Sequence, residues 1–221
     1  MYDRIINLIG EDNFNKIQNT KILLVGVGGV GSFAYEALIR SGFLNITIID
    51  KDKIEITNLN RQLVANLNTI NMAKVDVAKD KARNTHENIK ITAIEEFLSK
   101  DNINTLETDY NFIIDACDTL NTKLELIKFA NLHNIKIISS MGVGNRVDAS
   151  KIKITTLDKT NNDPLAKKLR KLVKENKISM KIPVVCSEEI PYKKGEIDSM
   201  ITSPGIAGLL MVNYIINNII K

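Results

Sequence analysis

Short apolar runs alternate with longer stretches of helical spacing between residues 21 and 140. The runs are rich in isoleucine, leucine and valine, which is typical of strands buried on both faces. The intervening segments place apolar residues on one side of a helix. This pattern predicts strands at 21–25, 46–49, 89–94, 112–115 and 135–138, and helices at 32–40, 71–83 and 122–132. The alternation indicates a mostly parallel sheet with helices on both faces.

The pattern changes after Met141, where glycines and an asparagine mark a turn. Asp163 followed by Pro164 is a good helix start, because the aspartate can cap and the proline fits the first turn. The further elements predicted are an antiparallel strand at 152–155, a helix at 165–175, a strand near the sheet edge at 182–185, a turn at 193–196 and a last helix opened by Pro204 and Gly205. We therefore predict an α/β fold: a Rossmann-like, doubly wound, mostly parallel sheet with antiparallel C-terminal strands and helices on both faces.

A chain of 221 residues, 44% of them hydrophobic, can bury one sizeable core. We expect a single domain over 1–221, divided into an N-terminal helical arm at 1–20, a core at 21–140 and a C-terminal region at 141–221. The longest apolar stretch, at 205–220, is shorter than the ~20 residues that span a bilayer and is interrupted by asparagines, so we expect no transmembrane span. The N-terminus carries no export signal, which predicts a cytoplasmic protein.

Composition excludes several classes of protein. The cysteines Cys117 and Cys186 are too few for a disulfide framework or for a four-cysteine zinc site. Tryptophan is absent and aromatic residues make up 5%, which argues against extensive platforms for base stacking. The net charge of +4 allows a polyanionic partner without requiring one.

A glycine-rich loop follows the first predicted strand and opens a helix, with Gly26, Gly28, Gly29 and Gly31 in a G-x-G-G-x-G pattern. Glycines let the backbone approach a phosphate, and the free amides of the helix start face the anion. Asp50 ends the second strand about 20 residues later, where a carboxylate can accept hydrogen bonds from ribose. The core at 21–140 is therefore predicted to bind a nucleotide. A tight strand–helix turn without a ligand is the alternative.

The residues after the second and fourth strands decide between nucleotide chemistries. Arg61 lies in a polar loop at 57–62, Lys74 follows on the next helix, and Asp115 and Asp118 close the fourth strand. In a doubly wound sheet these points share the carboxyl edge, where ligands bind. Cations that neutralise phosphate charge and an aspartate that holds Mg²⁺ suit triphosphate chemistry, whereas hydride transfer to NAD does not need them. Taken singly, each of Arg61, Lys74 and Asp118 could equally be a solvated surface charge.

With these motifs the sequence resembles the ubiquitin-activating-enzyme-like ATP adenylyltransferases, through residues 26–31, 48–50, 57–62, Lys74 and 115–118. The resemblance implies that a substrate carboxylate attacks the α-phosphate of ATP and that pyrophosphate leaves. It implies catalytic roles for Arg61, Lys74, Asp118 and, across a homodimer, Arg4, with Asp118 as the Mg²⁺ ligand. The nucleotide-binding residues that it implies are Gly26, Gly28, Gly29, Gly31, Asp50, Asp52, Asn58, Asn60, Arg61, Gln62, Lys74, Asp118 and Thr119.

The second half resembles one branch of that family, which dehydrates threonylcarbamoyladenosine beside the tRNA anticodon. Residues 155–160, 163–170, 185–189 and 203–208 carry this likeness, which covers nearly the whole chain. It implies that the adenylated carboxylate is attacked by an internal nitrogen, closing a ring and releasing AMP. The cofactors implied are ATP and Mg²⁺, and residues 141–221 become the substrate side and the dimer region.

The helix at 165–175 is strongly basic and offers a surface for the tRNA backbone. The tRNA-binding candidates are Lys167, Lys168, Arg170, Lys171 and Lys174; the alternative is a solvated amphipathic face. Cys186 is a candidate thiol, because some family members carry an acyl group or sulfur on a cysteine, and Lys181 could lower its pKa. Cys117 is expected to be a small packed residue.

The sequence departs from the family pattern at a few positions. Thr119 follows Asp118 where many relatives carry asparagine, the segment at 190–199 looks shortened, and the paired CxxC motifs of many sulfur-carrier-activating relatives are missing. Activation of the C-terminal glycine of a ubiquitin-like sulfur carrier, with a sulfur-transfer protein as partner, is therefore the second hypothesis. An NAD-dependent oxidoreductase and a regulatory nucleotide-binding module are the others.

Overall fold

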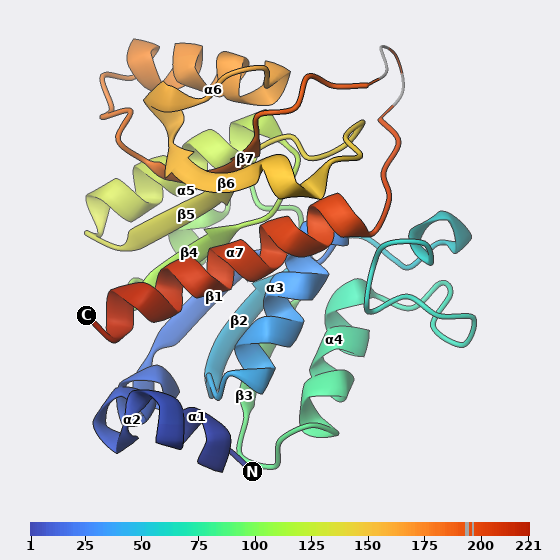
Figure 1. The fold of residues 1–221 in the computed structure, drawn as a ribbon, viewed down its shortest axis with the longest axis vertical. Helices are drawn as coiled ribbons and strands as arrows, with labels where there is room; N and C mark the ends of the chain where they lie inside the picture. The colour runs from blue at the N-terminus through green and yellow to red at the C-terminus, as the bar shows by residue number, and fades with distance from the viewer. Residues whose placement is uncertain (193–194, 196) are drawn as a thin grey trace.

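The computed structural model describes residues 1–192, 195 and 197–221. These residues form one seven-stranded sheet in the order β3-β2-β1-β4-β5-β7-β6, in which only β6 runs antiparallel to its neighbour (Figure 1). The strands are β1 (Lys21–Val25), β2 (Asn45–Ile49), β3 (Lys90–Ile94), β4 (Phe112–Asp115), β5 (Lys136–Ser140), β6 (Ile152–Thr156) and β7 (Pro183–Ser187). The strand order reverses between β1 and β4, and in doubly wound sheets the carboxyl ends of the strands at such a reversal are where ligands bind.

Helices cover both faces of the sheet (Figure 1). They are α1 (Asp3–Ile9), α2 (Glu11–Asn19), α3 (Gly29–Arg40), α4 (Lys74–Arg83), α5 (Leu120–Leu132), α6 (Pro164–Glu175) and α7 (Thr202–Ile219), with short 3-10 turns at Ile56–Asn58, Ile103–Thr105, Ala149–Lys151 and Leu157–Lys159. The predicted α/β architecture, with its parallel sheet and antiparallel end, is confirmed.

Two apolar cores lie on opposite faces because successive strand residues point to opposite sides. In β1, Ile22 and Leu24 join the core under α3, α4 and α7, whereas Leu23 and Val25 join the core under α5 and α6. A strand buried on both faces has no polar side, which is why β1 reads as a continuous apolar run.

Helix α7 packs tightly on the start of α3. A Cβ atom on Gly208 would lie 2.4 Å from the carbonyl oxygen of Val30, so only glycine allows this approach. A Cβ atom on Gly29, in the glycine-rich loop, would lie 3.3 Å from Cβ of Pro204 in the first turn of α7. The first turn of the C-terminal helix therefore lies beside the loop expected to bind phosphate.

Some predicted boundaries were wrong. Helix α4 begins at Lys74 rather than at 71, because Asn71 has a left-handed φ of 68° that a right-handed helix does not accommodate. Strand β7 begins at Pro183 and extends to Ser187, beyond its predicted end. It lies near the sheet edge as predicted, next to the edge strand β6, and its proline is tolerated as the first residue of the strand. Helix α7 begins at Thr202, before the predicted start. The turn expected at 193–196 includes Lys193, Lys194 and Glu196, which lie outside the described residues.

Candidate active site

The glycine-rich loop connects the end of β1 to the first turn of α3. Gly26 has a left-handed φ of 90°, and a Cβ atom on Gly31 would lie 1.8 Å from the carbonyl oxygen of Gly26. Both positions therefore require glycine. The loop brings the free amides of the helix start to the carboxyl edge of the sheet, in the geometry that suits a phosphate anion.

Asp50 is fixed beside this loop at the end of β2. Its Oδ2 atom accepts a 2.6 Å hydrogen bond from the backbone N–H of Val27, and its Oδ1 atom accepts one of 2.9 Å from the backbone N–H of Asp52. These two bonds hold the half-buried carboxylate at the edge of the crevice. The sequence-predicted ribose ligand and the phosphate loop are thus brought together by the fold.

Arg61 lies next to the loop on its other side. Its Nη1 atom donates to the carbonyl oxygen of Thr57 at 2.8 Å and to Oδ1 of Asn60 at 2.9 Å. Its Cδ atom would lie 3.7 Å from a Cβ atom on Gly29, so the aliphatic part of the side chain passes beside the phosphate loop. Asn58 is buried and stabilises the loop after β2, because its Oδ1 atom accepts a hydrogen bond from the backbone N–H of Glu55 at 3.1 Å.

Gln62 is a buried residue with an unused hydrogen-bond acceptor. Its side chain is next to Gly28, and its Oε1 atom has no hydrogen-bond partner among the described residues. A buried acceptor without a partner destabilises a protein unless a ligand or water satisfies it. This observation fits a nucleotide beside the loop.

Lys74 is also buried, as the first residue of α4. Its Nζ atom lies 3.0 Å from Oδ2 of Asp52, a carboxylate that is half exposed. The lysine is thus held near Asp50 by the segment that follows β2, and two residues of the predicted nucleotide set contact each other. Its contact with a triphosphate stays a prediction.

Asp118 is exposed in the turn after β4, and its Oδ1 atom accepts a 3.3 Å hydrogen bond from the hydroxyl of Thr119. No group of three or more His, Cys, Asp or Glu side chains suited to a metal occurs in the described ranges. Mg²⁺ is commonly bound through one or two carboxylates together with water and substrate phosphates, so a single aspartate beside the loop is compatible with it.

A cavity of about 490 Å³ lies beside Arg61. The lining residues come from the loop after β2 and from the segment before α7: Ile56, Thr57, Asn60, Arg61, Ile197, Asp198 and Ser199. The side-chain amide of Asn60 donates to the carbonyl oxygen of Ser199 at 2.9 Å and joins the two walls. We call this cavity the Arg61 cleft.

Sequence reasoning missed a buried ion pair below Asp118. Lys123 of α5 and Asp115 of β4 are both fully buried, and the lysine also donates to the carbonyl oxygen of Ser140 at 2.7 Å. The hydroxyl of Ser139 and the thiol of Cys117 donate to the same carboxylate. A lysine at an apolar helix position, eight residues after a strand-ending aspartate, was the available signal.

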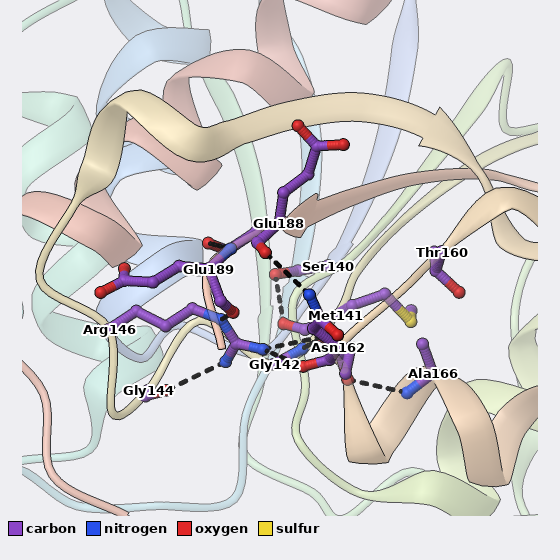
Figure 2. A network of polar contacts seen from close by, with 12 residues as sticks. Ser140, Met141, Gly142, Gly144, Arg146, Thr160, Asn162, Ala166, Glu188 and Glu189 are labelled. Carbon is purple, nitrogen blue, oxygen red and sulfur yellow. Dashed lines mark hydrogen bonds and ion pairs between the residues drawn. The ribbon is translucent and has the colours of Figure 1, made fainter. Parts of the chain in front are cut away.

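A second buried charge, Arg146, was also missed. Figure 2 shows its guanidinium group surrounded by three segments of the chain: it donates to the carbonyl oxygens of Gly144, Asn162 and Glu189 at 3.0, 2.9 and 3.2 Å. The carboxylate of Asp163 lies 3.9 Å away. Asp163 also caps α6 as the sequence predicts, accepting from the backbone N–H of Ala166 at 2.9 Å.

Arg4 is exposed on α1, far from the Arg61 cleft of the same chain. Tyr2, just before α1, donates a hydrogen bond to the carbonyl oxygen of Ile39 near the end of α3. The glycine-rich loop is at the other end of that helix, which is about 18 Å long. Figure 1 shows α1 and α2 at the opposite end of the sheet from the start of α3.

The basic residues of α6 divide into two groups. Lys167, Lys168, Lys171 and Lys174 are exposed to solvent. Arg170 instead turns inward and donates to the carbonyl oxygen of Thr160 at 2.9 Å. The Nζ atom of Lys181 lies 2.6 Å from Oδ2 of Asp158, so this lysine forms an ion pair with Asp158.

Both cysteines are in surroundings that disfavour the thiolate. Cys186 is buried within β7, and burial, followed by the nearby Asp163 carboxylate, raises its pKa to about 11. Burial and the adjacent Asp115 carboxylate also raise the pKa of Cys117. A reactive thiol needs a lowered pKa, so this geometry does not favour a chemical role for Cys186.

None of the helices in the described part of the chain combines the length and apolar character needed to cross a membrane.

Comparison with known proteins shows the family. A model of the ThiF family matches residues 2–221. The tRNA threonylcarbamoyladenosine dehydratase of Bacillus subtilis is 33% identical over 96% of this chain and 92% of that protein. The Escherichia coli protein of the same name is 36% identical over 76% of this chain, and the match spans 63% of that protein, less than two thirds of its length.

Solved structures agree with the sequence match. The crystal structure of Escherichia coli tRNA N6-threonylcarbamoyladenosine dehydratase in complex with ATP has a TM-score of 0.94 to this structure at 30% identity, covering 99% of this chain and 93% of that chain. A structure of the same protein in complex with AMP has a TM-score of 0.92 at 30% identity, covering 97% and 91% of the two chains. The chain therefore belongs to the ThiF family, in the group of tRNA threonylcarbamoyladenosine dehydratases.

Proposed function

We propose that this protein is an ATP-dependent dehydratase that cyclises threonylcarbamoyladenosine in tRNA. The observation that carries the proposal is the assembly of Asp50, the glycine-rich loop and Arg61 at one edge of the sheet. It occurs in a chain that matches the Bacillus subtilis dehydratase over nearly its full length. The relative in the ATP-bound crystal structure supports ATP as the cosubstrate.

The first step is adenylation of the substrate carboxylate. A carboxylate oxygen attacks the α-phosphorus of ATP, a C–O–P mixed anhydride forms, and the bond to the bridging oxygen breaks, so that pyrophosphate leaves. Arg61, beside Gly29, neutralises charge that grows on the phosphates, and Lys74 assists from the start of α4. Asp118 would hold Mg²⁺, which supplies further charge neutralisation when bound.

The second step is ring closure. An internal nitrogen of the substrate attacks the activated carbonyl carbon and loses its proton, and AMP departs with the former carboxylate oxygen. The net change in the nucleoside is the loss of one water. Because nucleophile and electrophile belong to one molecule, effective molarities of ~10⁵–10⁸ M are attainable when they are well oriented. No protein nucleophile is required, which agrees with the burial of Cys186.

The tRNA backbone is expected to bind along α6. Its exposed lysines, Lys167, Lys168, Lys171 and Lys174, would contact phosphates in a salt-dependent and sequence-independent way. Arg170 would act indirectly, because its guanidinium group holds Thr160 before the helix. The region 141–221 thus supplies the substrate side.

A homodimer would complete the site. Arg4 is too far from its own Arg61 cleft to act there, so its predicted role needs a second copy that presents the arm at 1–20 to the cleft. Ile206 and Leu209 on the exposed side of α7 offer apolar surface for such a contact.

Mass spectrometry of tRNA nucleosides tests the proposal. Incubation of the protein with ATP, Mg²⁺ and tRNA carrying threonylcarbamoyladenosine should convert the nucleoside to a product lighter by one water, with AMP and pyrophosphate in equal amounts. The Arg61→Ala variant should form the cyclic nucleoside and pyrophosphate about 10²–10³-fold more slowly. If a ubiquitin-like sulfur carrier drives pyrophosphate exchange and tRNA does not, the carrier-activating hypothesis replaces this one. Titration with NAD tests the oxidoreductase alternative.

A further inference from the structure

The basic helix α6 is tied to the loop that follows β5. Asp163 uses one carboxylate oxygen to cap α6 and the other to accept from the backbone N–H of Gly142 at 2.8 Å. Arg146, whose side chain is almost completely buried, bonds the carbonyl oxygen of Asn162 at the start of the same helix (Figure 2). The loop at 142–146 and the start of α6 therefore form one hydrogen-bonded unit.

The same loop holds one wall of the Arg61 cleft through Asn145. The backbone N–H of Asn145 donates to the carbonyl oxygen of Asp198 at 2.8 Å, and the Oδ1 atom of Asn145 accepts from the backbone N–H of Asp198 at 2.7 Å. Two opposed bonds between one pair of residues fix both position and orientation. Asn145 has a left-handed φ of 55°, a conformation that asparagine and glycine tolerate best.

The next residue completes the connection to the site. Ser199 accepts from the side-chain amide of Asn60, which in turn accepts from Arg61. Hydrogen bonds, linked by the backbone between Arg146 and Asn145 and between Asp198 and Ser199, therefore connect the cap of α6 to the arginine beside the phosphate loop. The end segments of this connection, α6 and the loop after β2, are far apart in the sequence, and the loop at 142–146 helps to connect them.

We propose that Asn145 is a positioning residue that sets the wall at 197–199 of the Arg61 cleft relative to the basic helix α6. The proposal rests on the proposed function: a tRNA held by α6 must place one carboxylate next to the α-phosphate of ATP. Phosphate contacts on α6 fix the tRNA. The two hydrogen bonds between Asn145 and Asp198 fix the wall of the cleft that receives its modified nucleoside. Loss of these two hydrogen bonds then misaligns the reacting atoms, while the affinities for tRNA at α6 and for ATP at the cleft stay the same.

The variant Asn145→Gly tests this directly. Glycine keeps the left-handed backbone but removes the acceptor for the Asp198 amide. The expected result is a fall in kcat for tRNA of about 10- to 100-fold, because small misplacements of reacting groups have effects of that size. The Kd for tRNA measured without ATP, the Kd for ATP and the thermal unfolding midpoint should all match those of the unmodified protein.

The matched control is Asn134→Gly. Asn134 has the same φ of 55° but is exposed after α5, remote from the cleft, so its substitution should leave kcat unchanged. A second variant, Arg146→Lys, keeps the charge but cannot reproduce the guanidinium bonds to three carbonyl groups, and it should lower the same kcat.

Three results would overturn the proposal: an unchanged kcat in Asn145→Gly, an equal loss in Asn134→Gly, or a loss in Asn145→Gly that parallels weaker ATP binding or a lower unfolding midpoint. The last result would assign Asn145 a purely structural role. The unmodified protein is measured in the same series. Absence of the cyclic nucleoside there would count against the proposed function itself, so the two failures are distinguishable.

Discussion

The ammonium group of Lys123 lies 3.1 Å from both carboxylate oxygens of Asp115, and neither side chain is exposed to solvent. The pair joins α5 to the end of β4, three residues before Asp118. Because each charge is compensated mainly by the other, removing one leaves the other buried and unpaired. The geometry of the turn that carries Asp118 therefore depends on an ion pair that solvent does not reach.

Replacement of Lys123 by methionine tests this dependence. Lys123→Met keeps an unbranched side chain of similar length but leaves the Asp115 carboxylate unpaired, so the free energy of unfolding should fall by about 3–5 kcal/mol. Urea denaturation followed by circular dichroism measures the loss. The control is Lys128→Met, which removes a partly exposed pair with Glu125 and should change stability by less than about 1 kcal/mol. Equal losses in both variants would show that burial of the pair is unimportant.

Arg61 and Asp118 should be needed for chemistry and not for folding. Arg61→Ala and Asp118→Ala should each lower pyrophosphate release by about 10²–10³-fold, because each removes charge stabilisation where the phosphates react. Both side chains are at the surface of the crevice, so the unfolding midpoint should change little. Arg40→Ala, which removes an exposed arginine at the far end of α3, should leave pyrophosphate release intact. Undiminished release in both site variants would contradict the adenylation mechanism.

The lysines of α6 should control tRNA affinity through charge alone. A Lys167→Gln, Lys168→Gln, Lys174→Gln triple variant should weaken tRNA binding, and each lost phosphate contact should reduce the slope of log K against log salt by about 0.7–0.9. The measurement is filter binding at several salt concentrations. The matched control carries Lys16→Gln, Lys90→Gln and Lys100→Gln, three exposed lysines on other elements, and should bind like the unmodified protein. Identical salt slopes for the two triple variants would exclude α6 as the binding surface.

The thiol of Cys186 should be unreactive toward alkylating reagents at neutral pH. Since its pKa in the folded protein is about 11 and that of a free thiol is lower, alkylation by iodoacetamide should be slow at pH 8 and should accelerate on unfolding. The sign of the linkage follows from the raised pKa. Between about pH 9 and 11 the unfolded chain loses this proton and the folded chain keeps it. The contribution of the protonated thiol to the free energy of unfolding is thus fully present below this pH window, and it declines as the pH rises through the window.

The background for this measurement is Cys117→Ala, which leaves Cys186 as the one thiol in the sequence. Cys186→Ala should retain dehydratase activity and lose less stability at alkaline pH. A loss of activity in Cys186→Ala with an unchanged unfolding midpoint would establish the chemical role that burial argues against.

Much of the fold could be predicted because it depends on local patterns. The strand Phe112–Asp115 matches its prediction residue for residue, since an apolar run between polar residues leaves few alternatives. The cap at Asp163 was also predictable, because the capping bond joins residues three apart. The start of α4 was not, because the left-handed conformation of Asn71 depends on how its segment packs: its backbone N–H donates to the carbonyl oxygen of Ile54.

The candidate site was predictable only in part. Gly26, Asp50 and Arg61 belong to short motifs, and the topology of the sheet brings their segments together. The pair Lys123–Asp115 left only the signal of a lysine at an apolar helix position, and the sequence does not mark Lys74 and Asp52 as partners. Arg146 had no sequence signal as a buried residue, because its acceptors are backbone carbonyl groups from three separate segments.

The close contact of α7 with α3 has a consequence for nucleotide affinity. Gly208 lets α7 lie directly on the backbone of Val30, and Pro204 lies against the glycine-rich loop. We expect this packing to restrain the loop before any nucleotide arrives, so that less of its conformational entropy remains to be lost on binding. We therefore expect α7 to strengthen ATP binding through preorganisation, without a contact of its own to the nucleotide.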